Sequence, residues 1–241
     1  MMKIEQHGAE CFSVESFITE KEADSIISYL DWISSSNILD WNQISFYGSL
    51  AMGFWDEDPT GGCEMFGLPK DYFHNMLKPR IKEMGESLIQ KRLDEVSYHA
   101  QKWVPGAFAA FHSDNSNEDG SPSEFERSKY ASFIYLNNDF KGGYLNFKNQ
   151  DIQIHPKKGM LVFFAGGHNN EHEVTKVHDG TRYTVGSFWD LDGLTYTEEQ
   201  VLERENKLKV TRSKQEEVYQ TWKDMTSMGI IPDYIGKNGE A

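Results

Sequence analysis

Cysteine and long apolar runs are both scarce in this 241-residue sequence. Cys11 and Cys63 are too few for a disulfide framework, so we expect a reducing, cytoplasmic setting. The longest apolar run, Met160–Ala165, has six residues, whereas a bilayer span needs about 20. The first residues also contain no apolar segment of the kind that directs secretion. The sequence therefore predicts no membrane insertion.

Basic residues are in deficit as well. The chain has 24 Lys and Arg against 38 Asp and Glu, which gives a net charge of −14. Phosphate backbones repel a protein this anionic, so we expect no nucleic-acid partner. The chain is long enough to bury a core without a disulfide or metal staple. An aromatic content of 13% together with 20 glycines favours a β-rich globular protein.

Helical patterns occur toward both ends of the chain. Thr19 and Glu22 have the spacing of a capping box, and they precede an apolar stripe made of Ile26, Ile27, Leu30 and Ile33. A second helix is predicted from about Pro79 to Leu93, because proline is tolerated in the first turn. After Leu194 a charged amphipathic stretch begins. We expect it to pack on the outside of the β core through apolar residues that include Val201, Leu202, Leu208, Val218 and Trp222, or alternatively to dimerise.

From Val96 onward the apolar residues alternate with a period of two, which is typical of strands. Turn residues separate eight such segments: 96–104, 107–112, 130–136, 143–147, 151–154, 159–164, 172–177 and 182–189. Eight short strands at this spacing indicate a sandwich or jelly roll. We therefore predict one domain that is mainly β with flanking helices. Its parts are N-terminal helical support over about 1–95, a β core over about 96–192 and a helical tail over about 193–241.

One strand end carries the residues of a candidate metal site. His112 and Asp114 are two positions apart, and in an extended strand side chains at i and i+2 point the same way. An imidazole and a carboxylate are two members of the facial triad that holds Fe(II) and leaves three coordination positions open. The same residue types also suit Zn²⁺, so a zinc site is an alternative.

The third ligand must come from a distant segment. His168, His172 and His178 are the candidates, and we favour His172 because it starts an alternating strand and so has a fixed direction. Ten residues later Arg182 opens the next strand. A guanidinium buried there is costly unless an anion meets it, and its planar fork suits a carboxylate.

In this order the motifs resemble a known family. They are His112-Ser-Asp114, Gly142-Gly143-Tyr-Leu-Asn-Phe147, Ile154-His-Pro156-Lys-Lys-Gly159, Phe163-Phe164, His172-Glu-Val174 and Gly180-Thr-Arg182-Tyr183. Over about residues 96–190 the chain is similar to the 2-oxoglutarate/Fe(II) dioxygenases, most of all to the prolyl 4-hydroxylase-like branch. The resemblance implies a double-stranded β-helix (jelly roll) core. It also implies Fe(II) on His112, Asp114 and His172, with 2-oxoglutarate and O2 as cosubstrates and ascorbate as a candidate reductant.

The resemblance also assigns residues around the cosubstrate. It implies that Tyr135 helps Arg182 to hold the distal carboxylate of 2-oxoglutarate. Trp103 takes the place of a tyrosine that the family commonly has in the lead-in strand. Phe188 stands where relatives that demethylate nucleic acids carry a second arginine. We assign Trp103 and Phe188 as substrate contacts.

The expected activity is hydroxylation of an unactivated C–H bond coupled to decarboxylation of 2-oxoglutarate. A prolyl residue in a peptide or protein is the first choice of substrate, and this choice rests on the resemblance. The acidic segment 115–129 is expected to be a long surface loop. Two interpretations stay open for it: a solvated insertion that tolerates change, or a segment that closes over a basic or proline-rich peptide. The alternatives are a hydroxylase of a free amino acid or other small molecule, and a non-catalytic jelly-roll binding module.

Overall fold

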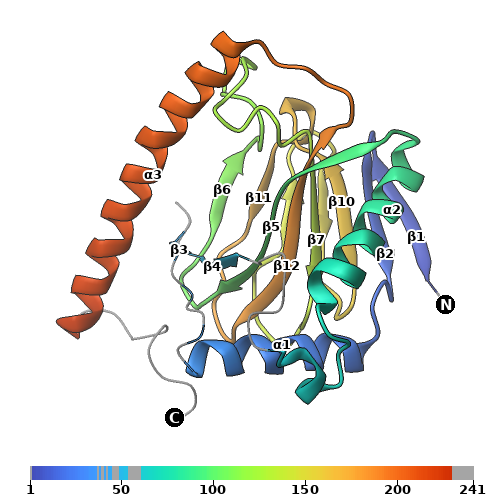
Figure 1. Ribbon diagram of the computed structural model, residues 1–241, viewed down its shortest axis with the longest axis vertical. Coiled ribbons are helices and arrows are strands. Elements are labelled where there is room, and N and C mark those ends of the chain that lie inside the picture. Colours follow the sequence, from blue (N-terminus) through green and yellow to red (C-terminus); the bar gives the residue numbers. More distant parts are fainter. Residues whose placement is uncertain are drawn as a thin grey trace.

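The computed structural model describes residues 2–36, 38, 41, 43–44, 49–53 and 61–229. Its strands form an eight-stranded and a four-stranded antiparallel sheet (Figure 1). The larger sheet has the order β1-β2-β10-β7-β12-β5-β4-β3 and the smaller sheet the order β6-β11-β8-β9. The strands of the larger sheet are β1 (Lys3–Gly8), β2 (Cys11–Glu15), β3 (Gln43–Ile44), β4 (Leu50–Gly53), β5 (Leu93–Trp103), β7 (Tyr130–Tyr135), β10 (Leu161–Ala165) and β12 (Arg182–Leu191); those of the smaller sheet are β6 (Ala109–His112), β8 (Leu145–Phe147), β9 (Ile152–Ile154) and β11 (His172–Val174).

The larger sheet is buried on both faces at β10, which explains why this strand is its most apolar one. In β10, Leu161 and Phe163 join the core on the helix side of the sheet. Val162 and Phe164 join a second core that lies between the two sheets. A strand covered on both faces needs apolar residues at every position, so β10 shows no alternation. This arrangement confirms the predicted mainly β fold with a jelly-roll core and helices at both ends.

Two helices cover the outer face of the larger sheet (Figure 1). The helix α1 (Glu20–Ser35) begins with the predicted capping box, in which the Glu22 amide donates to Thr19 Oγ1 at 3.1 Å and the Thr19 amide donates to Glu22. The helix α2 (Lys78–Ile89) follows the short helical turns η1 (Cys63–Phe66) and η2 (Phe73–Leu77). Apolar side chains of both helices join the core on the outer face of the sheet.

The N-terminal part of the chain is less helical than predicted. β1 and β2 form a hairpin that extends the larger sheet next to β10. The sequence pattern missed β1 because four of its six side chains, those of residues 3–6, are exposed, so no apolar face marks it. The turn of this hairpin contacts residues near the candidate site. Ala9 accepts a hydrogen bond from Asn170, and Gly8 lies against Gln150.

The C-terminal helix α3 (Glu198–Ser227) also differs from the expectation. It stands beside the smaller sheet rather than flat on the β core (Figure 1). Val201, Leu202 and Val218, which were expected to pack, are exposed. The side chain of Trp222 and the tail beyond residue 229 lie outside the described residues. In the part of the chain that is described, no helix combines the length and apolar character that crossing a bilayer requires.

A glycine in α2 allows the helix to approach the sheet closely. A Cβ atom on Gly85 would lie 2.4 Å from Phe163 Cε2 and 3.0 Å from Leu93 Cδ1. We expect Gly85→Val to lower the free energy of unfolding by about 2–3 kcal/mol through overpacking, measured by urea denaturation. The control is Gly53→Val, at an exposed strand position where a Cβ atom would have no atom of another described residue within 4 Å. Equal stability of the two variants would contradict this account of the helix–sheet contact.

Candidate metal centre and anion pocket

The pairing of two short strands brings two histidines together. β6 and β11 run antiparallel with His112 directly opposite His172. Their ring centroids are 4.4 Å apart. β6 ends at His112, and Asp114 follows two residues later with its side chain on the same side. The three residues that sequence reasoning selected as metal ligands therefore meet at one end of the smaller sheet.

The carboxylate lies close to both imidazoles. Asp114 Oδ1 is 3.7 Å from His112 Nε2 and 3.7 Å from His172 Nε2. One ligand atom from each residue lies within 4.8 Å of the others, and no other group of three such side chains meets this spacing among the described residues. Two histidines and one carboxylate on one side of a cation are the donor set of non-haem Fe(II) oxygenases, and they leave the other side open.

Backbone hydrogen bonds orient both rings toward that position. His112 Nδ1 is 2.7 Å from the Ala110 carbonyl oxygen, and His172 Nδ1 is 3.0 Å from the Asn170 carbonyl oxygen. A carbonyl oxygen only accepts, so each Nδ1 carries the proton and donates it. In this tautomer Nε2 is unprotonated in both rings, and its lone pair is available to a metal ion beside Asp114.

Burial disfavours the charged form of all three groups. It lowers the pKa of His172 to about 4. It also lowers the pKa of His112, and the neighbouring His172 adds to that effect. Burial raises the pKa of Asp114 to about 6, and Asp114 Oδ2 is buried without a hydrogen-bond partner among the described residues. Neutral imidazoles beside an undersolvated carboxylate are stabilised when a cation binds.

A glycine permits the position of the aspartate. The Asp114 amide donates to the Gly166 carbonyl oxygen at 2.8 Å. A Cβ atom on Gly166 would lie 2.9 Å from Asp114 Cβ and 2.5 Å from the Ser128 carbonyl oxygen. The turn that contains Gly166 follows β10 in the larger sheet. The larger sheet therefore supports the carboxylate, whereas the smaller sheet supplies both histidines.

Arg182 forms the centre of a second polar group. It is only 2% exposed, and its guanidinium carbon is 4.9 Å from the ring centroids of both Trp103 and Tyr135. Arg182 Nε and Nη1 and the hydroxyls of Tyr135 and Thr184 are buried without hydrogen-bond partners among the described residues. Tyr135 and Thr184 are cross-strand neighbours on β7 and β12. A buried cation with unmet donors is costly alone, and a carboxylate would satisfy it.

One cavity of about 680 Å³ connects the two groups. Its lining includes the three candidate metal ligands and Arg182. Between them the wall is apolar and comes from both sheets, with Phe133, Leu145, Val174 and Phe188. A ligand that spans this cavity can therefore meet a metal at one end and a guanidinium at the other. Such a ligand needs a metal-binding group and a carboxylate.

The cavity also shows where the other predicted site residues lie. Trp103 lines the cavity, and its ring also lies against the guanidinium of Arg182. Phe188 lines the wall and stacks with His99 at 5.9 Å between centroids. Tyr135 contacts Arg182 from the opposite side to Trp103 and is fully buried.

The two other histidine candidates lie elsewhere. His168 Nδ1 is 3.2 Å from Glu171 Oε1, and its side chain is half exposed. The His178 amide donates a hydrogen bond to the Lys141 carbonyl oxygen at 2.8 Å. Neither belongs to the group around Asp114.

Sequence reasoning missed a wall of the cavity that α3 provides. The helix contributes Arg204, Glu205, Leu208, Arg212 and Gln215 to the lining. These residues recur at helical spacing along one face, but their mixed charge hides the face from an apolar-periodicity search.

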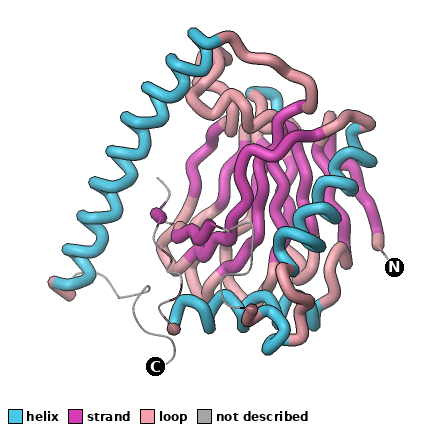
Figure 2. Tube along the Cα trace, in the orientation of Figure 1, coloured by secondary structure: helices cyan, strands magenta, loops and turns pink. Residues whose placement is uncertain are grey.

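The loop that follows β6 holds α3 in place. Thr211 Oγ1 donates to Glu124 at 2.6 Å, and Arg204 lies 3.7 Å from Glu126. Figure 2 shows this loop gathered at the end of the β core from which α3 starts. The acidic segment expected to be a surface loop thus contacts the helix, and together they close one side of the cavity.

Comparison with known proteins gives two kinds of match. Residues 98–190 match the family described as the 2OG-Fe(II) oxygenase superfamily. Over 61 residues the chain is 41% identical to human 2-oxoglutarate and iron-dependent oxygenase domain-containing protein 3, covering 23% of this chain and 19% of that protein. Over 78 residues it is 33% identical to human prolyl 3-hydroxylase 2, covering 30% of this chain and 11% of that protein. The chain thus spans less than one fifth of the length of these curated relatives.

Solved structures share the fold at low sequence identity. A Pseudomonas putida prolyl-4-hydroxylase superposes with a TM-score of 0.56 and 19% identity, covering 76% of this chain and 94% of that one. A Trichoplax adhaerens prolyl hydroxylase, solved with a hypoxia inducible factor oxygen degradation domain peptide fragment, gives a TM-score of 0.57 and 19% identity, covering 75% and 83%. These likenesses establish the shared fold.

Proposed function

We propose that this chain is a 2-oxoglutarate- and Fe(II)-dependent dioxygenase that hydroxylates a prolyl residue in a peptide or protein; the match of residues 98–190 to the 2OG-Fe(II) oxygenase superfamily supports this. The observation that carries the proposal is one cavity with a group of two histidines and one carboxylate at one end and a buried guanidinium at the other. The Nε and Nη1 atoms of that guanidinium have no hydrogen-bond partner among the described residues. This pair of features matches a cosubstrate that chelates iron at one end and carries a carboxylate at the other.

Each part of the cavity has a task in this proposal. His112, Asp114 and His172 would hold Fe(II) through two Nε2 atoms and a carboxylate oxygen. Arg182 and the Tyr135 hydroxyl would bind the distal carboxylate, which orients the keto acid group toward the metal. With Fe(II) and 2-oxoglutarate bound, the site supplies the oxidation in which O2 gives one oxygen atom to succinate, formed with CO2, and the other to the substrate C–H bond.

The protein's further contribution is to exclude water. The apolar side chains of Phe133, Leu145 and Val174 line the cavity. A dry wall strengthens the attraction between the guanidinium and a carboxylate, because the local dielectric is low. It also shields the reacting groups from solvent, while the protein leaves the redox chemistry to the bound groups.

Support for a peptide substrate comes from two sources. Several relatives and structural neighbours are named prolyl hydroxylases, and one was solved with a peptide fragment. The cavity also extends beyond the metal ligands to α3, which leaves a polar wall for a substrate to contact. A hydroxylase of a free amino acid is the alternative on the same metal site. The two are distinguished by offering the protein a proline-containing peptide and free amino acids separately and by detecting with mass spectrometry which of them gains one oxygen atom.

Three further expectations are part of the proposal. A reducing, cytoplasmic setting is supported by the low cysteine content. Ascorbate is proposed as the reductant on the family resemblance. The net charge of −14 supports a substrate other than nucleic acid.

The anion pocket can be tested separately from the metal. We expect Arg182→Met to raise the KM for 2-oxoglutarate by about 10- to 100-fold, since a hydrogen bond to a charged group contributes about 1.5–3 kcal/mol. Steady-state succinate formation measures this KM. Affinity for Fe(II) should stay within about twofold, because the guanidinium is no metal ligand. The control is Arg92→Met at a side chain that is 79% exposed. An unchanged KM for 2-oxoglutarate in Arg182→Met would refute the assignment of this pocket.

The substrate wall can be tested on α3. We expect Leu208→Glu to lower kcat/KM for proline-containing peptides by about tenfold, because it places a charge at a half-buried cavity position. The matched control is Leu202→Glu, at a residue of the same helix that is 63% exposed and outside the cavity lining. Peptide hydroxylation by mass spectrometry is the readout, and the KM for 2-oxoglutarate should be the same in both variants. Equal peptide turnover by the two variants would rule out α3 as a substrate wall.

A further inference from the structure

The two histidines differ in what supports the carbonyl that orients them. His112 donates to Ala110, which lies within the paired strand β6. His172 donates to Asn170, which lies outside any strand, at the end of the short helical turn η3 (His168–Asn170). A turn of three residues has little rigidity of its own. The Asn170 carbonyl therefore needs support from elsewhere in the chain if it is to fix the imidazole.

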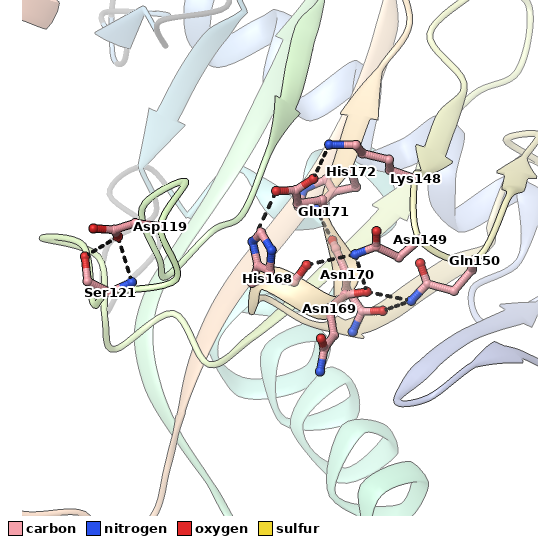
Figure 3. Close-up of polar contacts among 10 residues, drawn as sticks. All are labelled: Asp119, Ser121, Lys148, Asn149, Gln150, His168, Asn169, Asn170, Glu171 and His172. Carbon is pink, nitrogen blue, oxygen red and sulfur yellow. Dashed lines mark hydrogen bonds and ion pairs between the residues drawn. The ribbon is translucent and has the colours of Figure 1, made fainter.

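Two neighbouring amides supply that support from the turn between β8 and β9 (Figure 3). Asn149 Nδ2 donates to the His168 carbonyl oxygen at 3.0 Å and to the Asn169 carbonyl oxygen at 3.3 Å. Gln150 Nε2 donates to the Asn169 carbonyl oxygen at 2.9 Å and also to the side-chain oxygen of Asn170. Two consecutive side chains thus bond to all three residues of η3.

Asn170 links this turn to the N-terminal hairpin. It is only 3% exposed, and its side-chain amide donates to the Ala9 carbonyl oxygen at 3.4 Å. Gly8 of the same hairpin makes room for the Gln150 side chain, because a Cβ atom there would lie 2.9 Å from Gln150 Cγ. Gln150 Oε1 is buried without a hydrogen-bond partner among the described residues. The two hydrogen bonds that Gln150 Nε2 donates therefore determine the orientation of this side-chain amide.

Glu171, the residue between this turn and His172, makes further polar contacts. Glu171 Oε2 is 2.8 Å from Lys148 Nζ, and Glu171 Oε1 is 3.2 Å from His168 Nδ1 (Figure 3). The Lys148 amide also donates to the Glu171 carbonyl oxygen at 2.9 Å. Residues 148–150 therefore hold the segment that leads into His172 on both sides.

We propose that Gln150, acting through Asn170, is a positioning residue for His172. It fixes the Asn170 carbonyl oxygen, which keeps the His172 ring in the tautomer and direction that expose Nε2 to the metal. The inference rests on the proposed function, since it assumes that His172 binds the metal. Partners that orient a ligand in this way contribute to metal affinity and to ligand geometry as well as to folding.

The test compares the same substitution at two nearby glutamines, one in the turn between β8 and β9 and one on β9. Gln150→Met keeps the length of the side chain and removes its donors. The matched control is Gln153→Met, because Gln153 Nε2 donates at 2.8 Å to Asn146 and makes no bond to the η3 turn. Both purified proteins are titrated with Co(II), whose visible spectrum reports ligand geometry, and metal affinity is measured by competition with a chelator.

We expect Gln150→Met to weaken Co(II) binding by about tenfold and to change the visible spectrum, whereas Gln153→Met should match the wild type. Gly8→Ala, which displaces the Gln150 side chain, should change the spectrum in the same direction. Wild-type affinity and spectrum in Gln150→Met and Gly8→Ala would overturn the inference and leave the proposed function intact. Failure of the wild type itself to bind Co(II) would instead contradict the metal site and the proposed function with it.

Discussion

The register between β6 and β11 determines the site, because it sets His112 opposite His172. Side chains on a strand alternate between faces, so a shift of one residue would turn either imidazole away from Asp114. The strands that carry this register are only four and three residues long. Their stability must therefore come from their surroundings, which include β8, the turn held by Gln150, and the Gly166 turn of the larger sheet.

Several polar atoms in the interior of the fold have no hydrogen-bond partner among the described residues. Asp114 Oδ2, the Arg182 Nε and Nη1 atoms and the Tyr135 hydroxyl are buried without hydrogen bonds in the described part of the chain. Each such group lowers the stability of the protein when nothing is bound. Their grouping at two ends of one cavity explains why they persist, because a cation and a dicarboxylate would satisfy them together. Bound ligands would accordingly stabilise the fold, since they bind the native state alone.

Much of this could be predicted from the sequence. The pair His112 and Asp114 has strand spacing, and His172 starts an alternating segment, so their directions followed from the period of two. Arg182 could be placed near them only through the resemblance to the 2-oxoglutarate/Fe(II) dioxygenases, because the period of a strand gives the face of a side chain but not the neighbours of the strand. The N-terminal hairpin and the inner face of α3 could not be predicted. β1 is largely exposed and shows no apolar face, and the α3 face that lines the cavity mixes Arg204, Glu205 and Leu208. The role of Gln150 was equally hidden, because hydrogen bonds between a turn amide and a distant backbone leave no periodic signal.

The most direct test of the central claim is a crystal structure of the protein grown without oxygen in the presence of Fe(II) and 2-oxoglutarate. The account predicts one metal ion bonded to Nε2 of His112, Nε2 of His172 and a carboxylate oxygen of Asp114, with the keto acid end of 2-oxoglutarate on the metal and its other carboxylate on Arg182. A metal ion bound away from these three residues, or a cosubstrate carboxylate that does not reach Arg182, would contradict it.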